Sequence, residues 1–133
     1  MGILLMIHSL VRWLIVIAAL VAIVKFALGW LRGGSFQKFD RILTAAFSGL
    51  MDLQATLGLI ILLWNGLVDG AGFPMVRIEH TITMIVAVVV GHLPARWKNA
   101  EDKIRFRNTL FCIIGALALI YLGVSQLPGG WNR

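Results

Sequence analysis

Seven ionisable residues interrupt or border the long apolar stretches of this chain, and their types and spacing predict a buried polar site. They are His8, Arg12, Asp52, Arg77, Glu79, His80 and His92. Ionisable side chains are costly in hydrocarbon, so those inside membrane-spanning helices mark functional sites by default. Imidazoles and carboxylates can ligate a metal or carry a proton, and a guanidinium can neutralise an anion. The chemistry to look for is cofactor ligation, metal binding or proton transfer.

The elements that would position these residues are four apolar helices. Hydrophobic residues make up 59% of the 133 residues, and charged residues make up 14%. Stretches near the spanning length of about 20 residues recur four times, at roughly 7–30, 42–64, 75–93 and 108–127. A soluble domain would need a polar stripe on each helix, and the centres of these segments have none. We therefore expect residues 1–133 to form one all-α domain, an integral membrane four-helix bundle.

The basic residues predict how this bundle is oriented. Nine of the twelve lie at two junctions, between the first and second helices and between the third and fourth: Lys25, Arg32, Lys38, Arg41, Arg96, Lys98, Lys103, Arg105 and Arg107. Cytoplasmic loops of membrane proteins carry an excess of Lys and Arg, so we expect both junctions inside and both termini outside. Contact with the lipid bilayer then explains the positive charge, and no nucleic-acid partner is needed.

The three histidines lie at two different depths in the predicted bundle. His8 and His80 lie near the outer ends of the first and third helices, which run in the same direction, so the two side chains can face each other. Arg12 shares a helix face with His8, and Arg77 lies one turn before His80. His92 lies near the inner end of the third helix on a different face, and we expect it to belong to a different site.

This placement favours haem b held between His8 and His80. A bis-imidazole site needs two histidines from different helices at comparable depth in a dry pocket. The haem propionates would point toward Arg12 or Arg77. Met84 lies one turn after His80 and is the fallback axial ligand, in a His–Met arrangement.

Asp52 keeps other interpretations open. It could join His8 and His80 in a non-haem metal centre, or pair with Arg12 across two antiparallel helices. His80, Glu79, Asp52 and Arg12 could instead form a proton relay. In a further interpretation, the polar residues only orient a cofactor-free accessory subunit against a larger complex.

Two smaller patterns on the first and second helices also give expectations. Gln54 lies roughly 200° around its helix from Asp52, so the two side chains cannot both line one narrow pocket. Gly29-x-x-x-Gly33 is a weak helix-contact motif at the inner end of the first helix, where it could also serve to stop the helix.

Three segments of the chain carry a resemblance to a known family. His8-Ser9-Leu10-Val11-Arg12-Trp13, Asp52-Leu53-Gln54 with Gly58, and Arg77-Ile78-Glu79-His80 look like small four-helix bacterial membrane proteins of cytochrome b type. The likeness covers the first three helices and much less of the fourth. It implies a haem-binding electron-transfer subunit of the bacterial inner (cytoplasmic) membrane.

The expected partners follow from this resemblance. Electrons would pass to or from a quinol lodged near Trp13, Arg77 and Glu79. Other membrane subunits or a second copy of the chain would complete the assembly. Because the chain shows no flavin motif, nucleotide loop or nucleophile arrangement, we expect a redox subunit rather than an enzyme by itself.

The chain departs from this family in the second helix. Such proteins often carry His-x-Gln there, and this chain has Asp52 in place of the histidine. Two-haem cytochromes use four histidines in paired layers, and three histidines cannot supply that arrangement. One haem is therefore the ceiling for bis-histidine ligation.

Overall fold

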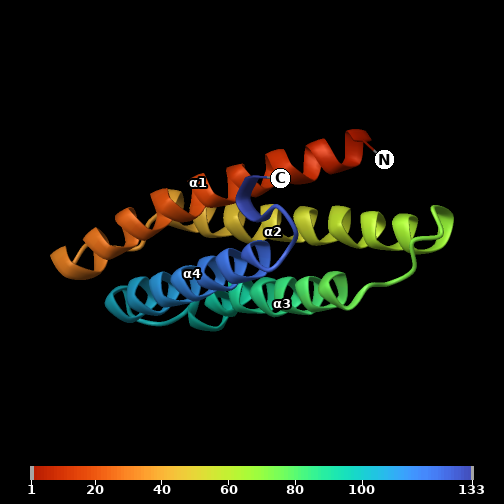
Figure 1. The fold of residues 1–133 in the computed structure, drawn as a ribbon. Helices are drawn as coiled ribbons and strands as arrows, with labels where there is room; N and C mark the ends of the chain where they lie inside the picture. Colours follow the sequence, from red (N-terminus) through yellow and green to blue (C-terminus); the bar gives the residue numbers. More distant parts are fainter. Residues whose placement is uncertain (1, 133) are drawn as a thin grey trace.

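The computed structural model describes residues 2–132, and within that range the chain forms helices and turns without a strand. Four long helices follow one another along the chain: α1 (Gly2–Arg32), α2 (Lys38–Leu63), α3 (Met75–His92) and α4 (Asp102–Ser125). Short helical turns extend or follow them: η1 (Trp64–Val68), η2 (Leu93–Trp97) and η3 (Gly130–Asn132). Figure 1 shows the long helices running back and forth along one direction. The all-α, four-helix prediction is confirmed.

All four helices are long and apolar enough to cross a membrane. With the turns that extend two of them, the candidate spans are Gly2–Arg32, Lys38–Val68, Met75–Trp97 and Asp102–Ser125. Large apolar side chains such as Leu20, Leu53 and Val89 are exposed on the outside of the bundle. An apolar exterior of this kind suits lipid, so the fold is compatible with a multi-pass membrane protein.

Three of the helices begin earlier than the sequence predicts. α1 begins at Gly2 rather than 7, α2 at Lys38 rather than 42, and α4 at Asp102 rather than 108. The prediction began α2 and α4 where their apolar pattern begins, but helical geometry already includes the charged residues before it; the residues added to α1, 2–6, are uncharged. At the start of α2, Asp40 accepts a hydrogen bond from the backbone N–H of Gln37 (2.9 Å), which caps the helix.

Aromatic side chains pack at one end of the bundle. We call this the basic end, because the connections 33–37 and 93–101 lie there and most of the basic residues flank them. The rings of Phe26, Phe36 and Phe106 lie with centroids 4.9 to 6.0 Å apart. The Phe106 ring lies against Gly29, where an added Cβ would be 2.6 Å from the ring carbons. Gly29 therefore makes a helix contact, while Gly33, with φ of +67°, ends α1.

An ion pair joins α1 to α2 near the same end. The carboxylate of Asp40 is 1% exposed and lies 2.7 Å from Nζ of Lys25. A buried carboxylate needs such a partner, because an unpaired charge away from water is strongly destabilising. The pair fixes the two helices relative to each other beside their connection.

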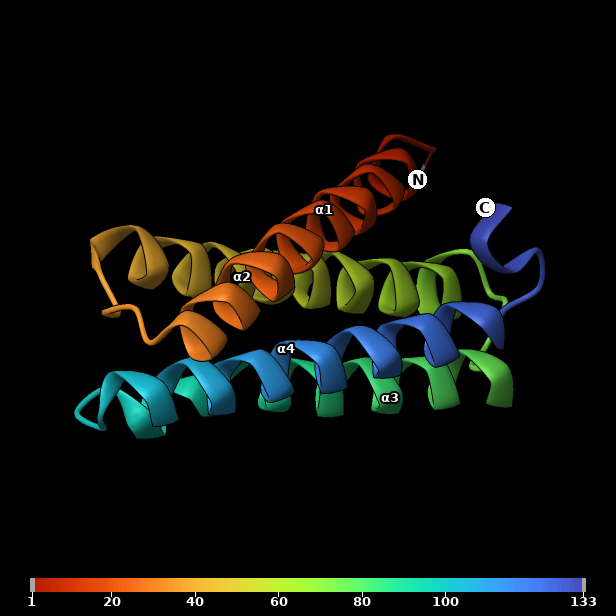
Figure 2. The ribbon, with the colours of Figure 1, turned by 90° about the vertical axis from the view of Figure 1, so that its left-hand side faces the viewer.

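Helix α1 crosses the other helices at an angle, as Figure 2 shows. Its C-terminal half lies close to α4, and its N-terminal end stands away from α3 and α4. The segment after α4 folds back toward that end of α1. There Trp131 packs against Trp13 and Tyr121, with ring centroids 5.5 and 6.0 Å apart. Opposite the basic end, α1 therefore diverges from α3 and α4.

Candidate functional site

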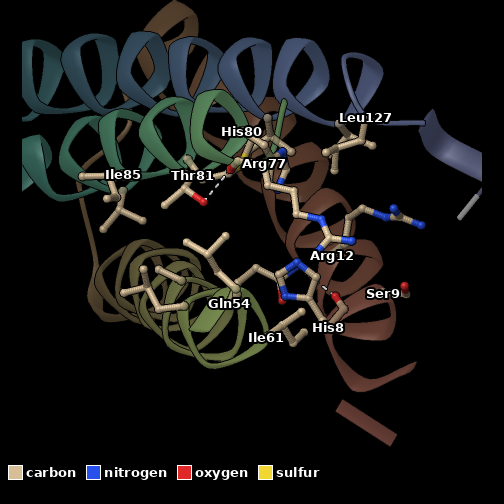
Figure 3. Close-up of a pocket in the computed structure, with 18 of the residues that line it drawn as sticks. His8, Ser9, Arg12, Gln54, Ile61, Arg77, His80, Thr81, Ile85 and Leu127 are labelled. Atoms are coloured by element: carbon tan, nitrogen blue, oxygen red, sulfur yellow. Dashed lines mark hydrogen bonds between the residues drawn. The ribbon is translucent and has the colours of Figure 1, made fainter. Parts of the chain in front are cut away.

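A cavity of about 240 Å³ lies between the four helices, away from the basic end. Apolar side chains form most of its wall, as is usual for a small-molecule site. All five residues expected to hold a cofactor line it: His8, Arg12, Arg77, His80 and Met84. Figure 3 shows the labelled polar side chains gathered around this space from α1, α2 and α3. From helix direction and depth, the sequence predicted that His8 and His80 could face each other.

His80 is held by a hydrogen bond to α4. Its Nδ1 lies 2.9 Å from the carbonyl oxygen of Gly123. Because a carbonyl can only accept, Nδ1 carries the proton and donates it, and in the neutral ring Nε2 then bears the lone pair. Histidines that ligate metals commonly donate their other ring N–H to a carbonyl or carboxylate in this way. The bond thus fixes both the orientation and the tautomer of His80.

His8 lies on the α1 side of the cavity, close to α2. Its ring packs against Gly58, where an added Cβ would lie 3.2 Å from Cε1 of the imidazole. The backbone at His8 is also anchored, because Nε2 of Gln54 donates to its carbonyl oxygen at 2.8 Å. Glycine at position 58 therefore provides the space that the ring occupies, and Gln54 ties α1 to α2 at the same level.

Two arginines bring positive charge to the cavity wall. Arg12 is 8% exposed, and its guanidinium carbon lies 5.4 Å from the ring centroids of both Trp13 and Trp131. Cations over indole faces are stabilised by the ring quadrupole. Nη1 of Arg77 is buried and has no hydrogen-bond acceptor among the described residues. A buried donor of this kind calls for an acceptor, which a ligand could supply.

Met84 lies beside His80 on α3 and also lines the cavity. Its methyl group packs closely on Gly123 of α4, the residue whose carbonyl accepts the His80 hydrogen bond. A flexible thioether at this position fills space and can move when a ligand enters. The glycine on α4 therefore lets two candidate ligands of α3 approach the neighbouring helix.

Asp52 lies outside this cavity. Its carboxylate is 2.7 Å from Nε2 of His92, and the two side chains are about half exposed, at 54% and 48%. The partner of Asp52 is thus His92 rather than the Arg12 considered from the sequence. Asp52 also does not join His8 and His80, and no three His, Cys, Asp or Glu side chains between residues 2 and 132 lie together as a metal site. The placement of His92 at a different site agrees with the sequence prediction.

The other polar residues considered from the sequence divide between the cavity and the surface. Glu79 is exposed and does not line the cavity, and Trp13 is 46% exposed. Of the three residues expected around a quinol, only Arg77 is therefore a cavity residue. A relay through Glu79, Asp52 and His80 would need these side chains in sequence, and Asp52 is bonded to His92 instead.

Gln54 is a polar cavity residue that the sequence pattern did not assign to a site. It lines the cavity, and its Oε1 is buried without a hydrogen-bond donor in the described part of the chain. The prediction that Gln54 and Asp52 face different neighbours is confirmed. The spacing of Met51, Gln54 and Gly58, which marks one helix face, was a signal that could have placed Gln54 beside His8.

Comparisons with protein-family models, with curated proteins and with solved structures find no match to this chain. The likeness to cytochrome b type proteins stays a prediction from the quoted residues. A function is therefore inferred from the cavity and the side chains around it.

Proposed function

We propose that this chain is a small membrane electron-transfer subunit that holds one haem b between His8 and His80. The observation that carries the proposal is the tautomer of His80, which its hydrogen bond to α4 fixes. Its Nδ1–H donates to the carbonyl of Gly123, which leaves Nε2 as the ligating nitrogen in a cavity that a histidine of another helix also lines.

The donor set around the cavity fits this group. His8 and His80 supply imidazoles from α1 and α3, and Met84 is a third candidate ligand beside His80. Arg12 and Arg77 supply positive charge for two carboxylates, and the buried Nη1 of Arg77 is a donor in need of an acceptor. Gly58 and Gly123 allow close approach to the backbone at both histidines.

The size of the cavity adds a condition. A haem is larger than about 240 Å³, so the cavity must widen to admit it. Long flexible side chains, Met84 and Arg77, form part of its wall and can move aside. The N-terminal part of α1 stands away from α3 and α4 in Figure 2, although Gln54 ties it to α2 at His8, so we expect the cavity to widen between α1 and α3.

When bound, the haem iron would supply one-electron oxidation and reduction. The protein's own residues set the conditions for this chemistry. The hydrogen bond to Gly123 fixes the tautomer of His80 with the lone pair on Nε2, and residues such as Ile15 and Val88 make the wall of the cavity apolar. The charges of Arg12 and Arg77 would offset the negative charge of the propionates in this low-dielectric space.

The membrane setting completes the proposal. With the basic end in the cytoplasm, the cavity and both termini lie toward the outer face of a bacterial inner membrane. The chain would exchange electrons with a lipid-soluble quinol or with other membrane subunits, because no second redox group is expected within it. In a homo-oligomer, a second copy of the chain could be that electron-transfer partner.

The test is an oxidised-minus-reduced visible spectrum of the protein purified in mild detergent. We expect sharp haem b bands in the wild type and their loss in His8→Ala and His80→Ala, with helix content unchanged by circular dichroism. His92→Ala is the matched control, because this histidine lies outside the cavity and should leave the bands intact. A folded wild type without bands, even after haem is added, would refute the proposal.

A second candidate function uses the same cavity without haem. Oε1 of Gln54 and Nη1 of Arg77 are a buried acceptor and a buried donor without partners in residues 2–132, and both residues line the cavity. A quinone or quinol ring carries the complementary acceptor and donor oxygens. A colourless protein that binds a short-chain benzoquinone, and loses this binding in Arg77→Gln, would favour this candidate. A colourless protein that binds neither would favour the cofactor-free accessory subunit.

A further inference from the structure

A second cavity, of about 220 Å³, lies at the basic end and shares no lining residue with the first. Arg41 from the start of α2, Arg105 from the start of α4 and His92 from the end of α3 all line it. Small residues, Ala45 and Gly91 among them, leave the space open. Three helices therefore bring basic side chains to one cavity that the proposed function does not use.

Arg105 is held in place by an aromatic side chain. Its guanidinium carbon lies 4.0 Å from the ring centroid of Phe36, which is 8% exposed and packs against Phe26 and Phe106. Stacking on an aromatic face occupies the plane of the guanidinium and leaves its N–H groups at the edge for an acceptor. The donor group is thus oriented before any ligand arrives.

Two nearby carboxylates are committed to other partners, and a third, Asp102, attracts Arg105 from more than 4.0 Å away. Asp40 binds Lys25 and the backbone N–H of Gln37, and Asp52 binds His92. Within residues 2–132, neither Arg41 nor Arg105 has a carboxylate within 4.0 Å or a hydrogen bond through its guanidinium. The two arginines also repel each other. An anion between them would neutralise both charges.

Two of the hydroxyl groups around this cavity already donate to backbone carbonyls. Thr44 donates to the carbonyl of Asp40 at 2.9 Å, and Ser48 donates to the carbonyl of Ala45 at 3.2 Å. The guanidinium groups are therefore the main donors, and planar guanidinium groups bind the oxygens of a phosphate in pairs.

We propose that this cavity binds a phosphate group through Arg41 and Arg105, carried either by an anionic lipid headgroup or by free inorganic phosphate. Its position at the basic end supports both sources. In the proposed orientation this end meets the anionic headgroups of the cytoplasmic leaflet and the phosphate of the cytoplasm. The site does not depend on haem, since the two cavities have separate walls.

The experiment uses the full chain purified in an uncharged detergent. Native mass spectrometry measures retention of phosphatidylglycerol, with phosphatidylcholine as the comparison lipid, and isothermal titration measures binding of sodium phosphate. The variants are Arg41→Gln, Arg105→Gln and the double variant. Arg107→Gln is the matched control, because it removes the same charge from the same helix as Arg105→Gln, and Arg107 is exposed and does not line the cavity.

We expect each single variant to weaken binding by roughly tenfold and the double variant to abolish it, because each arginine supplies charge-assisted hydrogen bonds. Selective retention of phosphatidylglycerol identifies a headgroup site, and binding of sodium phosphate alone identifies a free anion site. Equal loss in Arg107→Gln would show a general effect of net charge and overturn the proposal. So would the absence of binding to both probes. If Arg105→Gln fails to fold, Arg41→Gln still tests phosphate binding, because Arg41 is exposed and its replacement should not disturb folding.

Discussion

Replacing Gly58 by alanine tests the position of His8 with a single methyl group. The new Cβ would lie 3.2 Å from Cε1 of the imidazole, whereas carbon atoms in optimal contact lie about 3.5 to 4.0 Å apart. The ring must therefore move by a few tenths of an ångström. Ligand geometry in functional sites tolerates displacements of about 0.5 Å, so we expect weakened haem retention and altered bands rather than complete loss.

Gly49→Ala is the control for this variant. Both glycines lie on α2, but a Cβ at Gly49 would meet no atom within 4 Å. Each substitution gains about 0.5 to 1 kcal/mol from the lower flexibility of alanine, and the comparison cancels this shared gain. Thermal unfolding and the visible spectrum should both show the difference: Gly49→Ala raises Tm and keeps the wild-type bands, whereas Gly58→Ala gains less and changes them. Identical behaviour of the two variants would refute the placement of His8 against α2.

Two ion pairs give further predictions. Asp52→Asn should lower the free energy of unfolding by about 1 kcal/mol or less, because both Asp52 and His92 are half exposed, and it should leave the haem bands unchanged. Denaturation of Asp52→Asn, His92→Gln and the double variant measures this coupling, and loss of haem in Asp52→Asn would return Asp52 to the cofactor site. Lys25→Ala should cost more, about 2 to 3 kcal/mol, because it leaves the buried carboxylate of Asp40 without its cation. Denaturation against a Lys38→Ala control, which removes an exposed cation with no carboxylate partner within residues 2–132, checks this, and equal losses would contradict it.

The sequence placed the candidate ligands His8 and His80 better than it placed Asp52, whose partner is His92. His8, Arg12, Arg77, His80 and Met84 line one cavity, as helix direction and depth allowed. Direction and depth follow from counting residues along helices of known rise, so the order of residues in the chain is enough to determine them. The nature of the ligand does not follow from such counting and is a proposal.

The partner of Asp52 could not be read from the sequence. Arg12 was a reasonable candidate because α1 and α2 are adjacent and antiparallel, but the rotation of each helix about its axis decides which side chains meet. That rotation depends on packing, such as the Phe47 and Met51 side chains against Gly91 of α3. Because helix rotation was unknown, the sequence also could not show that Gln54 contacts His8 and lines the cavity. The start of α2 was missed for a different reason, since its cap and charged first turn extend the helix beyond its apolar stretch.

The close contact between Gly29 and Phe106 makes helix α1 a lever with its pivot at the basic end. His8 lies 21 residues before Gly29, which is roughly 32 Å along the helix axis at about 1.5 Å per residue. A change of about 5° in the tilt of α1 at this pivot would therefore move His8 by roughly 3 Å, a displacement comparable to a metal–ligand bond. The closeness of one phenylalanine ring to one glycine at the opposite end of the bundle therefore contributes to the width of the histidine cavity, together with the local tie between Gln54 and His8.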